Sequence, residues 1–216
     1  MVDFSLHSSY IYRGAIQNKG FVFQPSLHLA GYDNLKTIIW ANMDISSENS
    51  QKESFQFSEI KWQLGYEFKE LLFGWDLEIL AKEQFFPASI VSSPADALSR
   101  RELALKSRFA GYLNPSIAFY YGVQGVIKGQ KYCELTFKEQ IYVKKPFSLS
   151  FAAEAGYLEL PSTMDAKGLS HTKGTLSLAF FNYSFGAHYV KEGDKKVSDL
   201  REPAVFYLSA RVTNLF

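Results

Sequence analysis

The sequence predicts an all-β protein, a transmembrane antiparallel up-and-down β-barrel of about twelve strands in a single domain spanning residues 1–216. Three observations predict it. Apolar and polar residues alternate with period two along almost every segment, the connections alternate between short and long, and aromatic residues gather near segment ends. Strands with one apolar face, joined as successive hairpins, are typical of membrane barrels.

The alternation is clearest around residues 59–68, where Trp62, Leu64 and Tyr66 share one face and Lys61 and Gln63 share the other. Strands of nine to eleven residues span a bilayer when tilted, whereas a membrane helix needs about 20 apolar residues in a row, a run that does not occur here. We predict strands at residues 2–12, 21–32, 35–46, 55–68, 71–85, 102–112, 116–123, 130–143, 147–159, 173–182, 184–191 and 203–216.

The connections predict how the barrel sits in its membrane. Short ones fall at Asp33-Asn34, Lys69-Glu70, Leu113-Asn114-Pro115, Lys144-Lys145-Pro146 and the Tyr183 junction, and the longer ones at 13–20, 47–54, 86–101, 124–129, 160–172 and 192–202. Outer-membrane barrels have short periplasmic turns and longer external loops. With an even number of strands, both the N- and the C-terminus then lie in the periplasm.

Aromatic residues would form the two girdles that meet the lipid headgroups, with Tyr10 and Tyr12 on the loop side and Tyr66 and Phe68 on the turn side. The chain ends in Phe216 on the apolar face of the last segment. A terminal aromatic residue of this kind resembles the signal read by the barrel assembly machinery. We therefore expect that machinery, through Phe216, and outer-membrane lipids as partners.

A soluble barrel or sandwich with its apolar face turned inward is the alternative, because period two does not distinguish inside from outside. The loop lengths, the girdles and Phe216 favour the membrane barrel. The single cysteine, Cys133, excludes an internal disulfide, and the net charge of +1 gives no reason to expect a nucleic-acid partner. Since Met1-Val2-Asp3 leads directly into a strand-like segment, an exported chain of this kind would have lost its leader.

Several stretches resemble the TorF-like family of small bacterial outer-membrane porins. They are Tyr10-Ile11-Tyr12-Arg13-Gly14, Gln24-Pro25-Ser26-Leu27, Trp40-Ala41-Asn42-Met43-Asp44 and Asn114-Pro115-Ser116 with Phe119-Tyr120-Tyr121, Tyr132 and Glu134. The resemblance covers about the first two-thirds of the chain. It implies the same barrel architecture and adds little about transport.

If the apolar face meets lipid, the other face lines the lumen. The charged residues that we expect there are Arg13, Asp44, Glu59, Lys61, Asp76, Glu78, Lys106, Arg108, Glu134, Lys138 and Arg211. Glu139 falls on the lipid face, so we expect it near the periplasmic end or beside a bulge that shifts the register. Charges of both signs are nearly balanced, with Glu59 and Lys61 expected beside Asp76 and Glu78.

Two functions fit such a lumen. Separated acidic and basic tracks would make a narrow, porin-like channel for passive diffusion of small hydrophilic solutes or ions. Charges paired across the interior would instead make a non-conducting structural or interaction barrel that acts through its external loops. Twelve strands are intermediate in width, so size does not decide. A loop could also fold inward, and 86–101 is the longest candidate.

An enzyme is not expected. Some outer-membrane barrels hydrolyse lipids with a serine and a histidine on the lipid face, but His7, His28 and His188 fall on the lumenal face here and His171 in a loop. The sequence has no Gly-x-Ser-x-Gly, Cys-x-x-Cys or His-Glu-x-x-His motif. We expect neither a cofactor nor a metal site.

Overall fold

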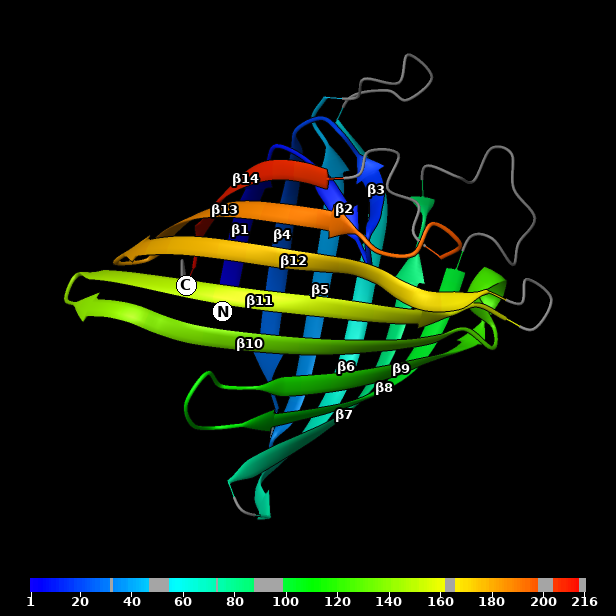
Figure 1. Ribbon diagram of the computed structural model, residues 1–216, viewed down its shortest axis with the longest axis horizontal. Coiled ribbons are helices and arrows are strands. Elements are labelled where there is room, and N and C mark those ends of the chain that lie inside the picture. Colours follow the sequence, from blue (N-terminus) through cyan, green and yellow to red (C-terminus); the bar gives the residue numbers. More distant parts are fainter. Residues whose placement is uncertain are drawn as a thin grey trace.

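Twelve strands close into an antiparallel barrel in the computed structural model, which describes residues 1–31, 33–46, 55–72, 74–87, 99–161, 166–197 and 204–213 (Figure 1). The strands of the wall are β1 (Val2–His7), β4 (Val22–Ala30), β5 (Leu35–Asp44), β6 (Gln56–Leu72), β7 (Trp75–Phe85), β8 (Ser99–Phe109), β9 (Ser116–Gln124), β10 (Lys131–Lys144), β11 (Phe147–Glu159), β12 (Lys167–Phe180), β13 (Tyr183–Glu192) and β14 (Ala204–Val212). A short 3-10 helix, η3 (Gly125–Ile127), follows β9. Each strand pairs with the next, and β1 pairs with β14 to close the ring. The predicted fold class is confirmed.

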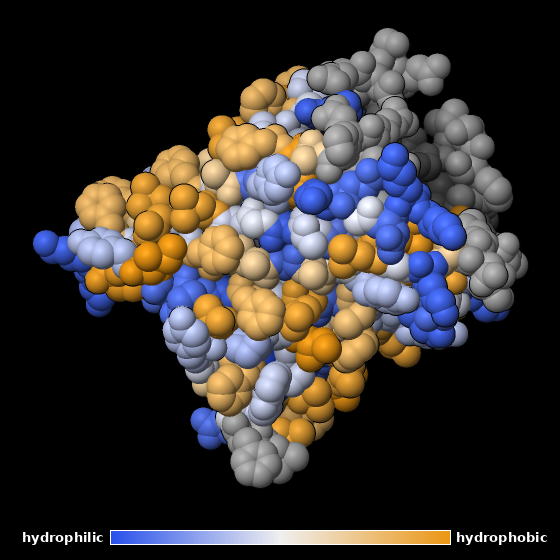
Figure 2. All heavy atoms as spheres, viewed as in Figure 1, coloured by the Kyte–Doolittle hydropathy of each residue, from blue (hydrophilic) through white to orange (hydrophobic). Residues whose placement is uncertain are grey.

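The apolar face of the wall points outward. Ile79, Phe119 and Phe206 are 50%, 50% and 65% exposed, whereas Glu59 and Glu102 on the inner face are each 4% exposed. Figure 2 shows many hydrophobic side chains on the visible outer face, with hydrophilic ones between them. A soluble barrel would have the opposite arrangement, so the soluble alternative is excluded. No helix among the described residues is long and apolar enough to cross a membrane.

Both ends of the described chain lie at the end of the barrel that carries the short connections. Phe4 pairs with Val212, and the N and C labels lie close together in Figure 1. Asp33 and Asn34 both have positive φ angles (53° and 64°), as do Leu113 and Asn114 (61° and 35°), so both predicted turns form with the backbone that Asn and Asp tolerate. We call this end the turn side and the opposite end the loop side.

Two predicted turns are misplaced. β6 continues through the predicted Lys69-Glu70 turn to Leu72, and Glu70 (φ 52°) instead lies in an irregularity of the β6–β7 register. Gly74, with φ +80°, occupies the turn itself because glycine adopts that conformation without strain. The turn predicted at the Tyr183 junction is formed by the two preceding residues, Phe181 (φ 52°) and Asn182, so that Tyr183 already pairs with Phe180.

Glu139 lies beside a bulge, as one of the two predicted explanations requires, and it contacts the end of the barrel that carries the short connections. The β10–β11 register shifts between Gln140 and Tyr142, which is a bulge. The carboxylate of Glu139 accepts a hydrogen bond of 2.6 Å from the main-chain N–H of Leu113 in a turn-side connection. Phe216 and most of the predicted loop 86–101 lie outside the described residues.

The first predicted strand, 2–12, is wrong beyond His7. The chain leaves the wall at Ser8 and forms a separate two-stranded hairpin from β2 (Tyr10–Tyr12) and β3 (Ala15–Asn18), then rejoins the wall as β4 at Val22. Figure 1 shows β2 and β3 toward the loop side, away from the N and C labels. We call residues 10–18 the lumenal hairpin. The alternation of apolar and polar residues correctly predicted extended backbone in the lumenal hairpin, but this pattern does not indicate that the chain bends into the lumen.

Candidate functional site

The lumenal hairpin reaches the wall formed by β6, β7 and β8 through polar contacts. The Tyr10 hydroxyl donates to Glu59 (2.9 Å), and Lys82 Nζ donates to the Tyr12 hydroxyl (2.8 Å). At the tip, both terminal nitrogens of Arg13 bond to the Glu102 carboxylate, at 2.5 and 3.1 Å. This bidentate pair fixes the position of the tip as well as neutralising its charge.

The other side of the hairpin packs against the opposite wall. Ile11 and Ile16 contact the buried pair Val190 and Tyr207 of β13 and β14. Gly14 (φ +81°) lies so close to β12 that a Cβ added to it would be 3.0 Å from the His171 Cβ. The hairpin therefore extends across the lumen from wall to wall in the loop-side half.

The cations around the hairpin lie over aromatic rings. The Arg13 guanidinium is 4.6 Å from the ring centre of Tyr120 and 4.4 Å from that of Tyr132. Lys61 Nζ is 4.2 Å from the ring centre of Trp40 and also pairs with Glu59 at 2.6 Å. Buried charges need such partners because they have lost their water, and cation–π contacts strengthen when desolvated. The loop-side half of the lumen is thus constricted by paired charges and tyrosines.

The turn-side half contains a polar cavity of about 480 Å³, which we call the histidine cavity. His7, His28 and His188 line it together with serines of β1, β4, β12, β13 and β14. His188 bonds to Thr175 (3.0 Å) and Ser209 (2.8 Å) and stacks on Tyr207 with ring centres 4.4 Å apart. The lining of the histidine cavity is thus rich in hydroxyl and imidazole groups that can exchange hydrogen bonds with a polar solute.

A second turn-side cavity of about 260 Å³ lies against β5 to β10, and we call it the carboxylate cavity. Arg108 bonds there to Glu67 (3.3 Å) and Asp76 (3.0 Å). Lys36 also pairs with Glu67, at 2.7 Å. The Arg108 side chain is 60% exposed, compared with 10% for Arg13, so the ion pairs of this half are in contact with solvent.

The predicted lumenal residues divide between the two halves. Asp44 and Glu59 are buried on the loop side, where Asp44 accepts from Asn42 at 2.9 Å. Lys61 is buried between the two halves, because it pairs with Glu59 and also lines the histidine cavity. Arg13 lies in the lumen on the hairpin tip and not on a wall strand. The turn-side cavities hold six others: Asp76, Glu78, Lys106, Arg108, Glu134 and Arg211. Lys138 is exposed at the turn-side rim, where its carbonyl accepts from the Asn114 amide.

The expected approach of Glu59 and Lys61 to Asp76 and Glu78 is wrong. In the β6–β7 hairpin Lys61 lies opposite Gln84, and Glu78 lies opposite Glu67. An antiparallel hairpin places the start of β7 beside the end of β6, so residues 59–61 and 76–78 are at opposite ends of the lumen. Lys61 pairs with Glu59 on its own strand, and Asp76 pairs with Arg108 of β8.

Glu102 and Glu67 are site residues that the sequence reasoning missed, although the pattern carried the signal. Glu102 shares its face of β8 with Lys106 and Arg108, and Glu67 continues the face of Glu59 and Lys61. The girdle assignment of Tyr10 and Tyr12 is wrong, because both side chains bond to lumenal residues. That error has the same origin as the misplaced first strand.

His171 is also corrected, from a loop to β12, where it lies between Ser170 and Glu154. Ser170 Oγ is 3.0 Å from His171 Nδ1, and His171 Nε2 is 2.9 Å from Glu154. This order of groups is that of a hydrolase triad. However, Ser170 is fully buried and its hydroxyl donates to the Gly156 carbonyl (3.0 Å). A nucleophile must be accessible to substrate and give its proton to a base, and Ser170 meets neither requirement in this arrangement. We therefore interpret these hydrogen bonds as structural, because they connect β11 to β12 beside the bulge between them.

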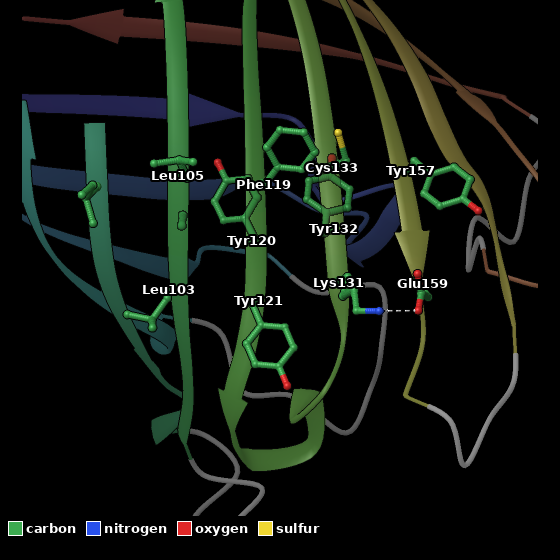
Figure 3. A pocket seen from close by; sticks show the side chains of 12 residues that line it. Leu103, Leu105, Phe119, Tyr120, Tyr121, Lys131, Tyr132, Cys133, Tyr157 and Glu159 are labelled. Carbon is green, nitrogen blue, oxygen red and sulfur yellow. Dashed lines mark hydrogen bonds and ion pairs between the residues drawn. The ribbon is translucent and has the colours of Figure 1, made fainter. Parts of the chain in front are cut away.

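The outer wall carries an apolar groove between the aromatic side chains of its loop-side end (Figure 3). Leu105, Phe119 and Cys133 line it, and Lys131 pairs with Glu159 at 2.7 Å along one edge. Aromatic and aliphatic side chains beside an interfacial lysine are expected where a barrel meets the lipid headgroups. We therefore assign the groove to the lipid-facing belt.

No family model matches the chain, and no curated protein matches it. Solved structures do. A NanC porin shares 9% sequence identity with this chain, covers 100% of both chains and has a TM-score of 0.59. A KdgM porin shares 8% identity over 99% of this chain and 98% of that chain, with a TM-score of 0.54. A KdgM porin in complex with disordered oligogalacturonate also has a TM-score of 0.54, at 9% identity. At this identity the likeness shows a shared fold, and the resemblance to the TorF-like porins stays a prediction.

Proposed function

We propose that this chain is a porin-like channel of the bacterial outer membrane, through which small hydrophilic solutes or ions diffuse passively. The observation that carries the proposal is the histidine cavity, a polar space of about 480 Å³ inside a closed barrel with an apolar exterior. Its lining residues belong to β1, β4 to β6 and β12 to β14, so the space is part of the interior that a solute would cross. The porin folds of the similar structures support the same interpretation.

The proposed orientation places the turn side, with both termini, in the periplasm. Short turns face the periplasm in known outer-membrane barrels, and longer loops face outward. The lumenal hairpin would then lie beneath the external mouth and the two cavities would open toward the periplasm. Phe216 is the residue that we propose the barrel assembly machinery to read.

Solute selection would depend on the hairpin and on the charges below it. Width would be set by the hairpin contacts of Tyr10, Tyr12 and Arg13 and not by the twelve-strand wall alone. Below the constriction, Lys106, Arg108 and Arg211 lie on the same route as Asp76, Glu78 and Glu134. Because fixed charge of one sign sets ionic selectivity, this balanced lining would give weak selectivity between cations and anions.

A filled structural or interaction barrel is the second candidate function. The observation that favours it is the set of buried ion pairs that connect the hairpin to the wall, above all Arg13 with Glu102. In that case the hairpin would brace the barrel permanently, and the external loops would carry the function.

Single-channel recording from the refolded protein in a planar bilayer separates the two candidates. Under a salt gradient the proposal predicts steady conductance steps with a small reversal potential. Heat-modifiable migration on a gel would establish in parallel that the protein is folded. A folded, inserted and silent barrel would overturn the channel and favour the filled barrel.

A further inference from the structure

β14 has a free edge beside the point where the hairpin leaves the wall. β14 begins at Ala204, but β1 pairs with it only from Ser209 to Val212. One further main-chain hydrogen bond extends this contact to Leu208, whose carbonyl accepts from Ser8 N–H (3.0 Å). In an antiparallel ladder every second residue turns its N–H and C=O toward the same neighbour. Phe206 and Ala204 therefore face the gap, with no strand partner on that edge among the described residues.

The lumenal hairpin continues the β1–β4 hairpin. His7 pairs with Val22 in the wall, and Tyr10 pairs with Asn18 in the lumen, so the same two stretches of chain remain antiparallel neighbours throughout. Ser8-Ser9 on one side and Lys19-Gly20-Phe21 on the other interrupt the pairing, and the register also shifts within the lumenal hairpin at Gln17. The lumenal hairpin is thus joined to the wall by two short segments at the same height, the arrangement of a hinge.

Side-chain hydrogen bonds hold both segments of the hinge in place of a regular ladder. Leu208 N–H donates to the Ser8 hydroxyl (2.9 Å), where a straight strand would offer the Ser8 carbonyl. Ser9 Oγ donates to the Asn18 carbonyl (2.8 Å), and Gly20 N–H donates to the Asn18 side chain (2.7 Å). A polar side chain that substitutes for a main-chain partner can be exchanged for that partner without leaving a group unsatisfied.

We propose that the lumenal hairpin is a gate that swings on this hinge between the lumen and the barrel wall. In the wall position β1 would continue from His7 to Tyr12 along the free edge of β14. Continuing the present register places Tyr10 opposite Phe206 and Tyr12 opposite Ala204. The exchange itself is a property of the barrel, whereas its effect on conductance rests on the proposed channel function.

The sequence of the hairpin suits both positions. Along β1 the even-numbered side chains face outward, as the 41% exposure of Leu6 indicates, and Asp3 faces inward. In the wall position Tyr10 and Tyr12 would therefore join exposed Phe206 in the outer aromatic belt, and Ile11 would face the lumen. In the lumenal position the same tyrosines bond to Glu59 and Lys82. Tyrosine fits both environments because its ring is apolar and its hydroxyl is polar.

Disulfide trapping in lipid vesicles tests the exchange, in a Cys133→Ala background so that no other thiol competes. Tyr12→Cys with Ala204→Cys would trap the wall position, since residues opposite one another in a ladder have Cα atoms about 5.5 Å apart, within disulfide range. Gly14→Cys with His171→Cys would trap the lumenal position. Tyr12→Cys with Ser177→Cys is the control, because these residues are opposite each other in neither position.

Both traps are expected to form and the control is not. The wall trap should raise mean conductance at least about tenfold over the lumenal trap, and reduction should abolish the difference. In the wall-trap pair, Arg13→Gln should speed cross-linking about tenfold because it removes the bidentate bond to Glu102.

Three results are decisive. If residues 12 and 204 never cross-link while 14 and 171 do, the hairpin does not exchange and the gate is overturned. If both traps form and conduct equally, the hairpin moves but does not gate. If both traps form and neither conducts, the exchange stands and the proposed channel function fails.

Discussion

The two halves of the lumen are built from the same strands and the same alternation, yet they differ in what fills them. On the loop side, Glu59 and Glu102 are buried against the lumenal hairpin and their cationic partners. On the turn side, Asp76 and Arg108 border a cavity, and Arg108 is largely exposed. Strand number and inward charge are similar in both halves, so neither explains why one half is filled and the other contains cavities. The difference comes from the lumenal hairpin, nine residues that leave the wall and fill the loop-side half.

The largest difference is expected in stability. Glu102→Gln would leave Arg13 and Lys82 without their carboxylate in a buried site, which should cost about 3–5 kcal/mol of unfolding free energy. Arg108→Gln, the turn-side counterpart, should remain within about 1 kcal/mol of wild type, because the Arg108 side chain is largely exposed and its partner Glu67 keeps the ion pair with Lys36. Denaturant titration of the refolded barrels measures both. Equal losses in the two variants would remove the distinction between the halves.

On the outer wall, the cost of introducing an arginine should depend on how deep the residue lies in the bilayer and not on which half of the lumen lies behind it. Ile79 lies near the middle of β7 on the outer face, and Ile79→Arg should destabilise the inserted barrel by about 2–4 kcal/mol. Val123, near the loop-side end of β9, is the control, and Val123→Arg should cost about 0–1 kcal/mol. An Ile79→Arg barrel as stable in vesicles as wild type would show that this face does not meet lipid.

Solvent access along β12 should be lower in the loop-side half of the lumen than in the turn-side half. Ser170 and Ser177 both belong to β12, but Ser170 is fully buried beside the hairpin, and Ser177 lines the histidine cavity. In the Cys133→Ala background, Ser177→Cys should react with a charged thiol reagent about 100-fold faster than Ser170→Cys, which must wait for local opening. Similar rates would mean that water fills both halves.

The smallest effect is expected in ionic selectivity. Replacing Lys106 and Arg108 with glutamine leaves Glu67, Asp76, Glu78 and Glu134 in the carboxylate cavity, and the reversal potential in a salt gradient should shift toward cations. Lys131→Gln on the outer wall, which removes an equally cationic group from outside the lumen, should not shift it. An unchanged potential in the double variant would remove these two residues from the ion path.

The sequence was sufficient to predict the barrel because its signals are local. Alternation depends on residue i and i+2, so the faces of Trp62 and Lys61 were readable directly, and Asp33-Asn34 marked a turn by its own backbone preference. Gly74 shows the limit of such signals. The Lys69-Glu70 pair was as plausible a turn, and only the pairing of Phe68 with Leu77 shows that β6 continues past it.

The site was harder to predict because it depends on contacts between distant residues. Arg13 and Glu102 are far apart in the sequence, and no local pattern reports that the guanidinium of one meets the carboxylate of the other. The Tyr10-Ile11-Tyr12 stretch has the same alternation as a lipid-facing strand. Its inward position follows from the bend at Ser8-Ser9 and from the partners available inside the barrel, neither of which alternation encodes.

Removing the hairpin tests most directly whether it closes the loop-side half. A variant in which residues 9–20 are replaced by Asn-Gly would join Ser8 to Phe21 by a tight two-residue turn and leave the wall pairing of His7 with Val22 intact. The measurement is its single-channel conductance beside that of wild type in the same bilayer. Larger, steady conductance steps in the shortened barrel are the predicted result. Identical conductance in two folded barrels, or silence in both, would contradict the claim that the hairpin is the constriction of a channel.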